Sequence, residues 1–302
     1  MKDSTVPDTP SAPRRDGDDR SGRRPAGPGA RGGGARPGRP QGEDPFKDLP
    51  RGRHEPAGIE RARRTQGAPP RPGRSKEPAP ARPPLPVDEE PRLPKAVRRE
   101  IDRVLGRGDR ARDVALALSI GGEAIDLEQP EIALEVLAWA KHVAPRIPAV
   151  REAYGIARYL DEDWAGALTE LQAYRRMTGR VDQNHVIADC LRGLGRELDR
   201  VAEIVEELLA EERAPEDRRA EGVVVWASAL ADEGDVGAAR ALLRRFLDRP
   251  GKADQPHDLR VRVLAASLAE RDGDHDDARR QRAIVAKSDP ELFENLADAP
   301  EA

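Results

Sequence analysis

The stretch Gly155–Leu171, GIARYLDEDWAGALTEL, has the pattern of one helix ending, a tight turn and a second helix beginning. An alanine follows a turn of this kind several times. Ala133 and Ala167 lie 34 residues apart, and Ala239 and Ala278 lie 39 apart. Self-similarity at such a period indicates stacked helical hairpins, none of which buries its apolar face alone. We therefore predict an all-α helical-hairpin solenoid.

Apolar side chains at helical spacing extend this pattern in both directions. Val97, Ile101, Val104 and Leu105 form a one-sided stripe, which predicts a capping helix that begins near residues 93–94 and ends at Gly106. Runs that alternate with period two are few, so strands are not expected. Five helix pairs are predicted, at 112–127 with 130–143, 147–160 with 164–177, 182–194 with 197–211, 215–231 with 236–247, and 256–271 with 274–287.

Glycine marks the turns inside the later pairs at a regular spacing of 39 residues. Glycine closes a helix in the left-handed conformation, and a following aspartate can cap the next helix. These turns are Gly195-Arg196, Gly234-Asp235 and Gly273-Asp274.

The chain before the solenoid has a different composition. Residues 1–90 hold 18 of the 28 prolines and 13 of the 27 glycines, with Phe46 as their one aromatic residue. Such a segment cannot bury enough apolar surface to offset its ordering entropy. We predict a disordered arm over 1–92, a solenoid over 93–290 and a short acidic tail over 291–302. Residues 1–112 carry 27 Lys and Arg against 17 Asp and Glu, whereas the rest carries 25 against 39.

The repeated units resemble the tetratricopeptide repeat family. In the second pair the resemblance rests on Gly155 and Ala157, the turn before Trp164, then Ala167 and Leu171. The other pairs carry parts of the same pattern. The departures are Arg282 where an apolar residue belongs, and Arg200 where the alanine of the third pair belongs, which suggests a second helix shifted toward Ala202. The other matches are Gly121, Ala133, Leu137 and Pro145; Ala227, Gly234, Ala239 and Leu243; and Ala266, Gly273, Ala278 and Pro290.

The resemblance implies a right-handed superhelix whose inner face is lined by the first helix of each pair. Such a groove suits an extended or helical peptide, and an unoccupied solvated face is the alternative. The inward-facing residues that the resemblance implies are Glu152, Ile156, Tyr159, His185, Asp189, Arg192, Val224, Ser228, Arg260, Val263, Ser267 and Arg271.

Motifs for catalysis or metal binding are missing from the sequence. The five histidines have no metal-ligand spacing, and neither a phosphate-binding glycine loop nor a nucleophile elbow is present. The acidic run 272–277 lacks the glycine and glutamate of a calcium loop and is typical of an inter-helix turn. Cys190, between Ala188 and Leu191, is expected to be a buried core residue. We predict no enzyme activity, no cofactor and no metal.

The leading hypothesis is a non-catalytic scaffold that binds a protein or peptide partner of unknown identity. A nucleic-acid-associated protein is the alternative, because arginines of the arm could contact phosphates without sequence preference. A third possibility is that the basic arm folds back on the acidic solenoid. Without an apolar leader or a membrane-length run, the chain is expected in the cytoplasm. The arginines concerned are Arg14, Arg15, Arg23, Arg24, Arg31, Arg36, Arg39, Arg61, Arg63 and Arg64.

Overall fold

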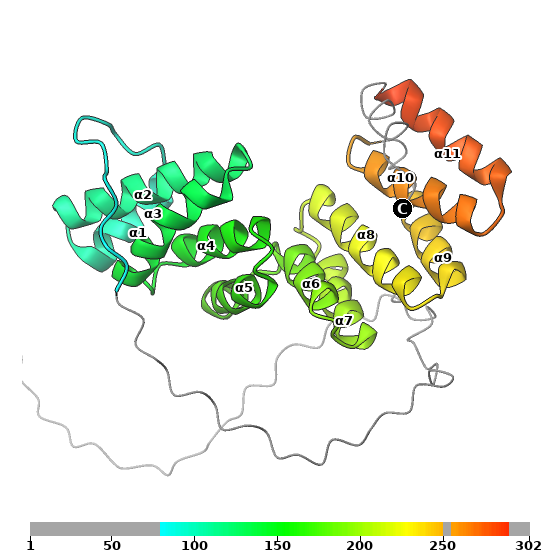
Figure 1. Cartoon of the computed structure of the whole chain (residues 1–302), viewed down its shortest axis with the longest axis horizontal. Helices are drawn as coiled ribbons and strands as arrows, with labels where there is room; N and C mark the ends of the chain where they lie inside the picture. Colours follow the sequence, from blue (N-terminus) through cyan, green and yellow to red (C-terminus); the bar gives the residue numbers. More distant parts are fainter. Residues whose placement is uncertain (1–78, 250–254, 290–302) are drawn as a thin grey trace, which may run out of the picture. The chain divides into compact units, whose positions relative to one another are not determined.

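The computed structural model describes residues 79–249 and 255–289. Those residues form eleven α-helices and no strand (Figure 1). The residues 1–78 of the predicted arm and the predicted tail 291–302 lie outside the described residues. The helices are α1 (Lys95–Leu105), α2 (Asp109–Asp126), α3 (Pro130–Val143), α4 (Pro148–Leu160), α5 (Trp164–Thr178), α6 (Asn184–Gly193), α7 (Leu198–Ala210), α8 (Glu216–Asp232), α9 (Val236–Leu247), α10 (Asp258–Arg271) and α11 (His275–Ser288).

The helices pack as consecutive hairpins, which confirms the predicted fold class. α2 packs on α3, α4 on α5, α6 on α7, α8 on α9, and α10 on α11 (Figure 1). The first helix of each pair also contacts the first helix of the next pair, from α2 through α4, α6 and α8 to α10. α1 contacts α2, as expected for a capping helix. Each hairpin therefore shares an apolar seam with its neighbours.

Glycines at equivalent positions let the first two pairs cross closely. A Cβ atom on Gly121 would lie 2.5 Å from Cγ of Leu137, and one on Gly155 would lie 2.8 Å from Cγ of Leu171. Both leucines are fully buried. The second glycine–leucine contact lies 34 residues after the first, so both helix pairs cross in the same way.

The turns inside the later pairs use the predicted glycine chemistry. Gly195, Gly234 and Gly273 have φ angles of 60°, 87° and 78°, in the left-handed region that disfavours other residues. Asp235 caps α9 by accepting a hydrogen bond from the Ala238 amide at 2.9 Å. Asp163 caps α5 and Asp274 caps α11 in the same way. The N-cap of α7 is Glu197, whose side chain makes no capping bond.

Replacement of Asp235 by alanine should lower the free energy of unfolding by about 1 kcal/mol, because an amide of α9 loses its partner. Glu197→Ala is the matched control, since its side chain does not cap α7, and it should change stability by less than about 0.5 kcal/mol. Urea unfolding followed by circular dichroism measures both. Equal losses for the two variants would contradict the capping role.

The third pair shows the predicted shift in its second helix. Arg200 is exposed, and Ala202 is buried within α7 at 5% exposure. The small residue that meets α6 is therefore displaced by two positions along the sequence. Cys190 on α6 is fully buried, as expected, and burial raises the pKa of its thiol to about 12.

The apolar core of the described residues divides into two clusters. One joins α1 to α4 and includes Ile101, Leu137 and Tyr154. The other joins α5 to α10 and includes Trp226 and Phe246. The boundary between the clusters falls between α4 and α5, so the described residues have no single central core of the globular type.

Candidate functional site

The polar residues predicted to line a groove lie on the first helices of successive pairs. On α4, Glu152, Ile156 and Tyr159 are spaced i, i+4, i+7, which places them on one side of the helix. α6, α8 and α10 carry equivalent stripes. We call the surface formed by these stripes the first-helix face; its residues are Glu152, Ile156, Tyr159, His185, Asp189, Arg192, Glu221, Val224, Ser228, Asp232, Arg260, Val263, Ser267 and Arg271.

A chain of hydrogen bonds crosses three helices of this face. The Tyr159 hydroxyl on α4 donates to the Asp189 carboxylate on α6 at 2.7 Å. Arg192 donates to Asp189 at 2.9 Å and to Asp232 at the end of α8 at 3.0 Å. Burial and the Asp189 carboxylate raise the pKa of Tyr159, which keeps the phenol protonated as a donor. The structure thus brings together three predicted residues and adds Asp232.

A second row of polar contacts runs beside the first. Gln183, the N-cap of α6, donates to the Glu152 carboxylate at 2.7 Å. Burial raises the pKa of Glu152, despite that hydrogen bond. Arg218 of α8 lies 2.9 Å from Nε2 of His185 on α6. The sequence pattern did not single out Gln183 or Arg218, since both fall at helix starts outside the i, i+4, i+7 stripe.

His185 is held neutral by these surroundings. It is 8% exposed, and burial, followed by the Arg218 charge, lowers its pKa to about 4. A guanidinium can only donate, so Nε2 accepts the hydrogen bond and the proton resides on Nδ1. His185 is therefore a fixed acceptor for Arg218 rather than a proton shuttle.

Stability should fall as the pH is lowered from 6.5 to about 4. In that range the unfolded chain binds a proton at His185 and the folded chain does not. We expect the wild type to lose about 2 kcal/mol more over this range than His185→Gln does. Glu152 and Glu221, whose pKa values burial raises, act with the opposite sign but are present in both proteins. Urea unfolding at the two pH values measures the difference.

His142→Gln, which removes an exposed histidine, is measured beside it as the control. An unchanged pH dependence in His185→Gln would show that His185 is not the group that titrates.

The face continues to α10 through a charged pair. Arg260 lies 3.1 Å from Glu221 of α8. Ser267 and Arg271 follow Arg260 at i+7 and i+11 on the same stripe and are exposed. They are not part of the hydrogen-bonded rows. Ser228 lies half-buried on the α8 stripe between Glu221 and Asp232.

Val224, Ile156 and Val263 are the half-buried apolar residues that were predicted for this face. Val224 and Ile156 pack against the second apolar cluster. Part of each side chain remains accessible, so the face offers small apolar areas among its polar groups.

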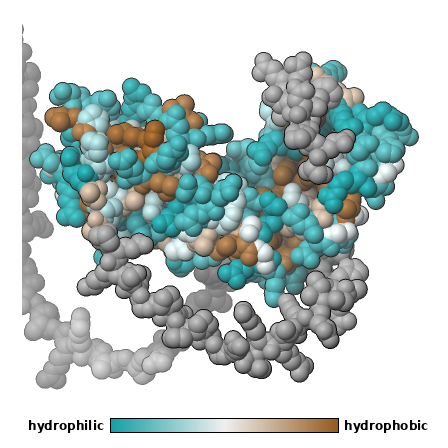
Figure 2. Space-filling view, in the orientation of Figure 1, coloured by the Kyte–Doolittle hydropathy of each residue, from teal (hydrophilic) through white to brown (hydrophobic). Residues whose placement is uncertain are grey.

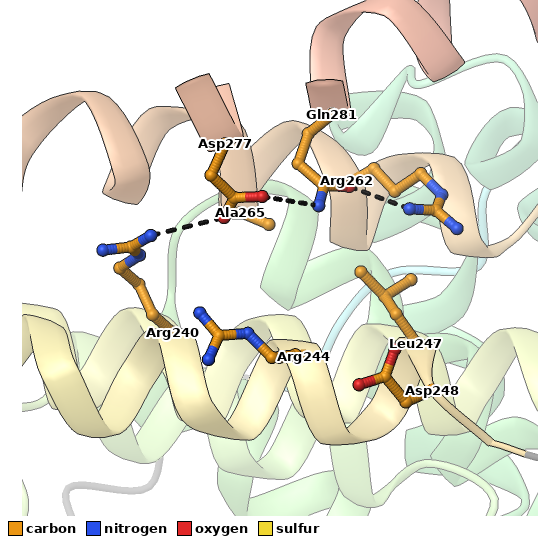
Figure 3. A pocket seen from close by; sticks show the side chains of 8 residues that line it. All are labelled: Arg240, Arg244, Leu247, Asp248, Arg262, Ala265, Asp277 and Gln281. Carbon is orange, nitrogen blue, oxygen red and sulfur yellow. Dashed lines mark hydrogen bonds and ion pairs between the residues drawn. The ribbon is translucent and has the colours of Figure 1, made fainter. Parts of the chain in front are cut away.

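A separate hollow lies between α9, α10 and α11 (Figure 3). Arg240 contacts Asp272, and lies 2.6 Å from Asp274 and 3.3 Å from Asp277. Asp277 accepts a hydrogen bond from Gln281, whose carbonyl in turn accepts one from Arg262. The guanidinium of Arg240 is compensated by three carboxylates, so we assign this network to holding the last pair against α9.

The described residues contain no group of three His, Cys, Asp or Glu side chains placed to hold a metal ion. Within the same residues, none of the helices has both the length and the apolar character needed to cross a bilayer. On the face drawn in Figure 2, apolar residues lie in separate areas between hydrophilic ones. The arm arginines of the nucleic-acid hypothesis fall outside the described residues, and that hypothesis stays a prediction.

The fold and this face define a helical-hairpin repeat protein. Comparison with protein-family models gives no match, and neither does comparison with curated proteins.

Proposed function

We propose that the chain is a non-catalytic scaffold of the tetratricopeptide type, which holds a protein or peptide partner against the first-helix face. The observation that carries this proposal is the hydrogen-bonded row from Tyr159 through Asp189 and Arg192 to Asp232. This row fixes polar side chains of three helices before any partner arrives. Side chains ordered in advance lose less entropy on binding, so the partner is held more tightly.

The chemistry of the face defines the kind of partner. Carboxylates of Glu152 and Glu221 alternate with the guanidinium groups of Arg192, Arg260 and Arg271. Half-buried apolar side chains lie between them. An extended or helical peptide with both charge signs and a few apolar anchors would complement this surface. Since the helices are rigid elements, recognition would depend on the partner's sequence rather than on folding of the scaffold.

Charge reversal at Arg192 tests the proposal. Arg192→Glu places a carboxylate beside Asp189 and Asp232, which breaks the row and repels an acidic group of the partner. The full-length protein would be used for affinity capture from its native cells, with quantitative mass spectrometry. We expect the amount of captured partner to fall about tenfold or more, which is a typical effect of losing a central charged contact.

Arg200→Glu is the matched control, because Arg200 is an exposed arginine of α7, outside the face, and also pairs with a carboxylate on its own helix, Glu203. It should keep the partner, and circular dichroism should show intact helices in both variants. If Arg192→Glu retains the partner as well as Arg200→Glu does, the first-helix face is not the binding surface.

A further inference from the structure

Residues 79–93 lie before α1 without helix or strand, bend at 87–88 and pack against α2; we call them the strap. Composition assigns residues 79–92 to the arm, yet they make specific contacts. Pro83 and Leu85 are the only buried residues of the strap. Leu85 joins the apolar cluster that includes Ile101 and Val114.

Three side chains of α2 hold the strap by different chemistry. Asp113 receives a two-point hydrogen bond from the Arg82 guanidinium, at 2.8 and 2.9 Å. Arg112 donates to the backbone carbonyls of Val87 and Glu89. Ser119 Oγ accepts a hydrogen bond from the backbone amide of Arg92 at 2.9 Å.

Most of these contacts do not depend on the strap's own side chains. Arg112 and Ser119 contact backbone groups, which any extended peptide offers in the same positions. The strap's own side chains matter chiefly at Arg82, which pairs with Asp113, and at Pro83 and Leu85, which are buried. Leu93 also packs against the apolar cluster. The remaining strap residues are largely exposed, with Val87 at 79%. A segment held by so few anchors opens more easily than the helices beneath it.

We propose that this surface of α2 is a binding site for an extended, proline-rich segment of a partner protein that carries Arg-Pro-x-Leu. In the free chain the strap occupies the site. The partner segment displaces it by making the same contacts through its own arginine and leucine. This site is distinct from the first-helix face. The test of the strap site is therefore independent of the test of the proposed function.

The strap competes strongly because it is tethered beside its site, at an effective concentration on the order of 1 mM. A free peptide therefore binds the wild type only weakly, and binding should strengthen when the strap is loosened. The strap variant Arg82→Ala with Leu85→Ser removes the ion pair with Asp113 and the buried leucine, and it leaves every α2 residue of the site unchanged.

The test measures binding of a fluorescent synthetic peptide of residues 79–94 to the full-length chain by anisotropy. We expect the peptide to bind the loosened variant at least tenfold more tightly than the wild type. The same peptide carrying Leu85→Arg is the matched control, because it keeps the backbone contacts to Arg112 and Ser119 and loses only the buried leucine. It should bind at least tenfold more weakly than the strap peptide.

Charge exchange tests the role of Asp113. With Asp113→Arg added to the loosened variant, the strap peptide should no longer bind, and a peptide carrying Arg82→Glu should bind instead. If the double strap variant loses its helical circular dichroism, Arg82→Ala alone provides the test, since that side chain is 52% exposed; a gain of at least threefold is then expected.

Two results would overturn the proposal. One is a strap peptide that does not bind a loosened, folded chain. The other is a dimer formed by strap exchange between two wild-type copies, detected by sedimentation, while the free peptide stays unbound.

Discussion

Gly121→Val should lower the free energy of unfolding by about 3 kcal/mol. The first atom of any side chain at this position would meet Cγ of Leu137 at 2.5 Å, closer than van der Waals contact allows. Leu137 is fully buried, so it can move only by displacing its neighbours in the α1–α4 cluster. Overpacking of a close-packed core costs about 1–3 kcal/mol and occasionally more. Thermal and urea unfolding by circular dichroism would measure this loss.

The next residue provides the matched control. Gly122 lies on the same helix, and a Cβ atom there would meet nothing within 4 Å. Gly122→Val should therefore change stability by no more than about 0.5 kcal/mol, because valine is a slightly better helix former than glycine. Leu137→Ala in the Gly121→Val background should recover part of the lost free energy of unfolding. Such a recovery would show that the two residues are coupled through direct contact. Similar losses at Gly121 and Gly122 would contradict the close crossing of α2 and α3.

Trp226→Ala should lower the free energy of unfolding by about 3–5 kcal/mol, the range for removing a buried aromatic side chain. Trp226 on α8 is 1% exposed and belongs to the apolar cluster of α5–α10. Its loss should leave a cavity between hairpins rather than in one shared core. We therefore expect hydrogen exchange to accelerate in α8 and its neighbours, while α2 and α3 keep their protection.

Trp164 is the control for this substitution. It is half-buried at the start of α5 and contacts the Tyr159 ring edge-on, with centroids 5.4 Å apart. Trp164→Ala should lower the free energy of unfolding by about half as much as Trp226→Ala does, because its side chain buries less apolar surface. If Trp226→Ala accelerates exchange evenly through all described helices, the two clusters act as one core and the hairpin description is wrong.

Helix positions could be predicted from the sequence because the apolar stripes and the turn residues agree. α9 begins at Val236 and ends at Leu247, as the pattern predicts. α2 begins at Asp109, three residues before its predicted start. The early residues Asp109 and Arg110 are exposed and carry no apolar signal, so periodicity could not include them.

The contacts of the candidate site could be predicted only in part. Tyr159, Asp189 and Arg192 were expected on the inner face because the helix pairs resemble tetratricopeptide repeats, and their helical spacing is consistent with one side of α4 and of α6. Their partner Asp232 is 40 residues from Arg192, and that contact depends on how α6 crosses α8. The strap was missed for a similar reason. Its composition is typical of disorder, and its order comes from three α2 side chains and the buried Leu85.

The most direct test of the first-helix face is photo-cross-linking in the native cell. A benzophenone side chain would be placed at Ser267, exposed on α10, and separately at Ala241, exposed on α9. Adducts would be identified by mass spectrometry. We expect a specific protein adduct from Ser267 and none from Ala241. An adduct of the same protein from Ala241 but not from Ser267 would contradict it.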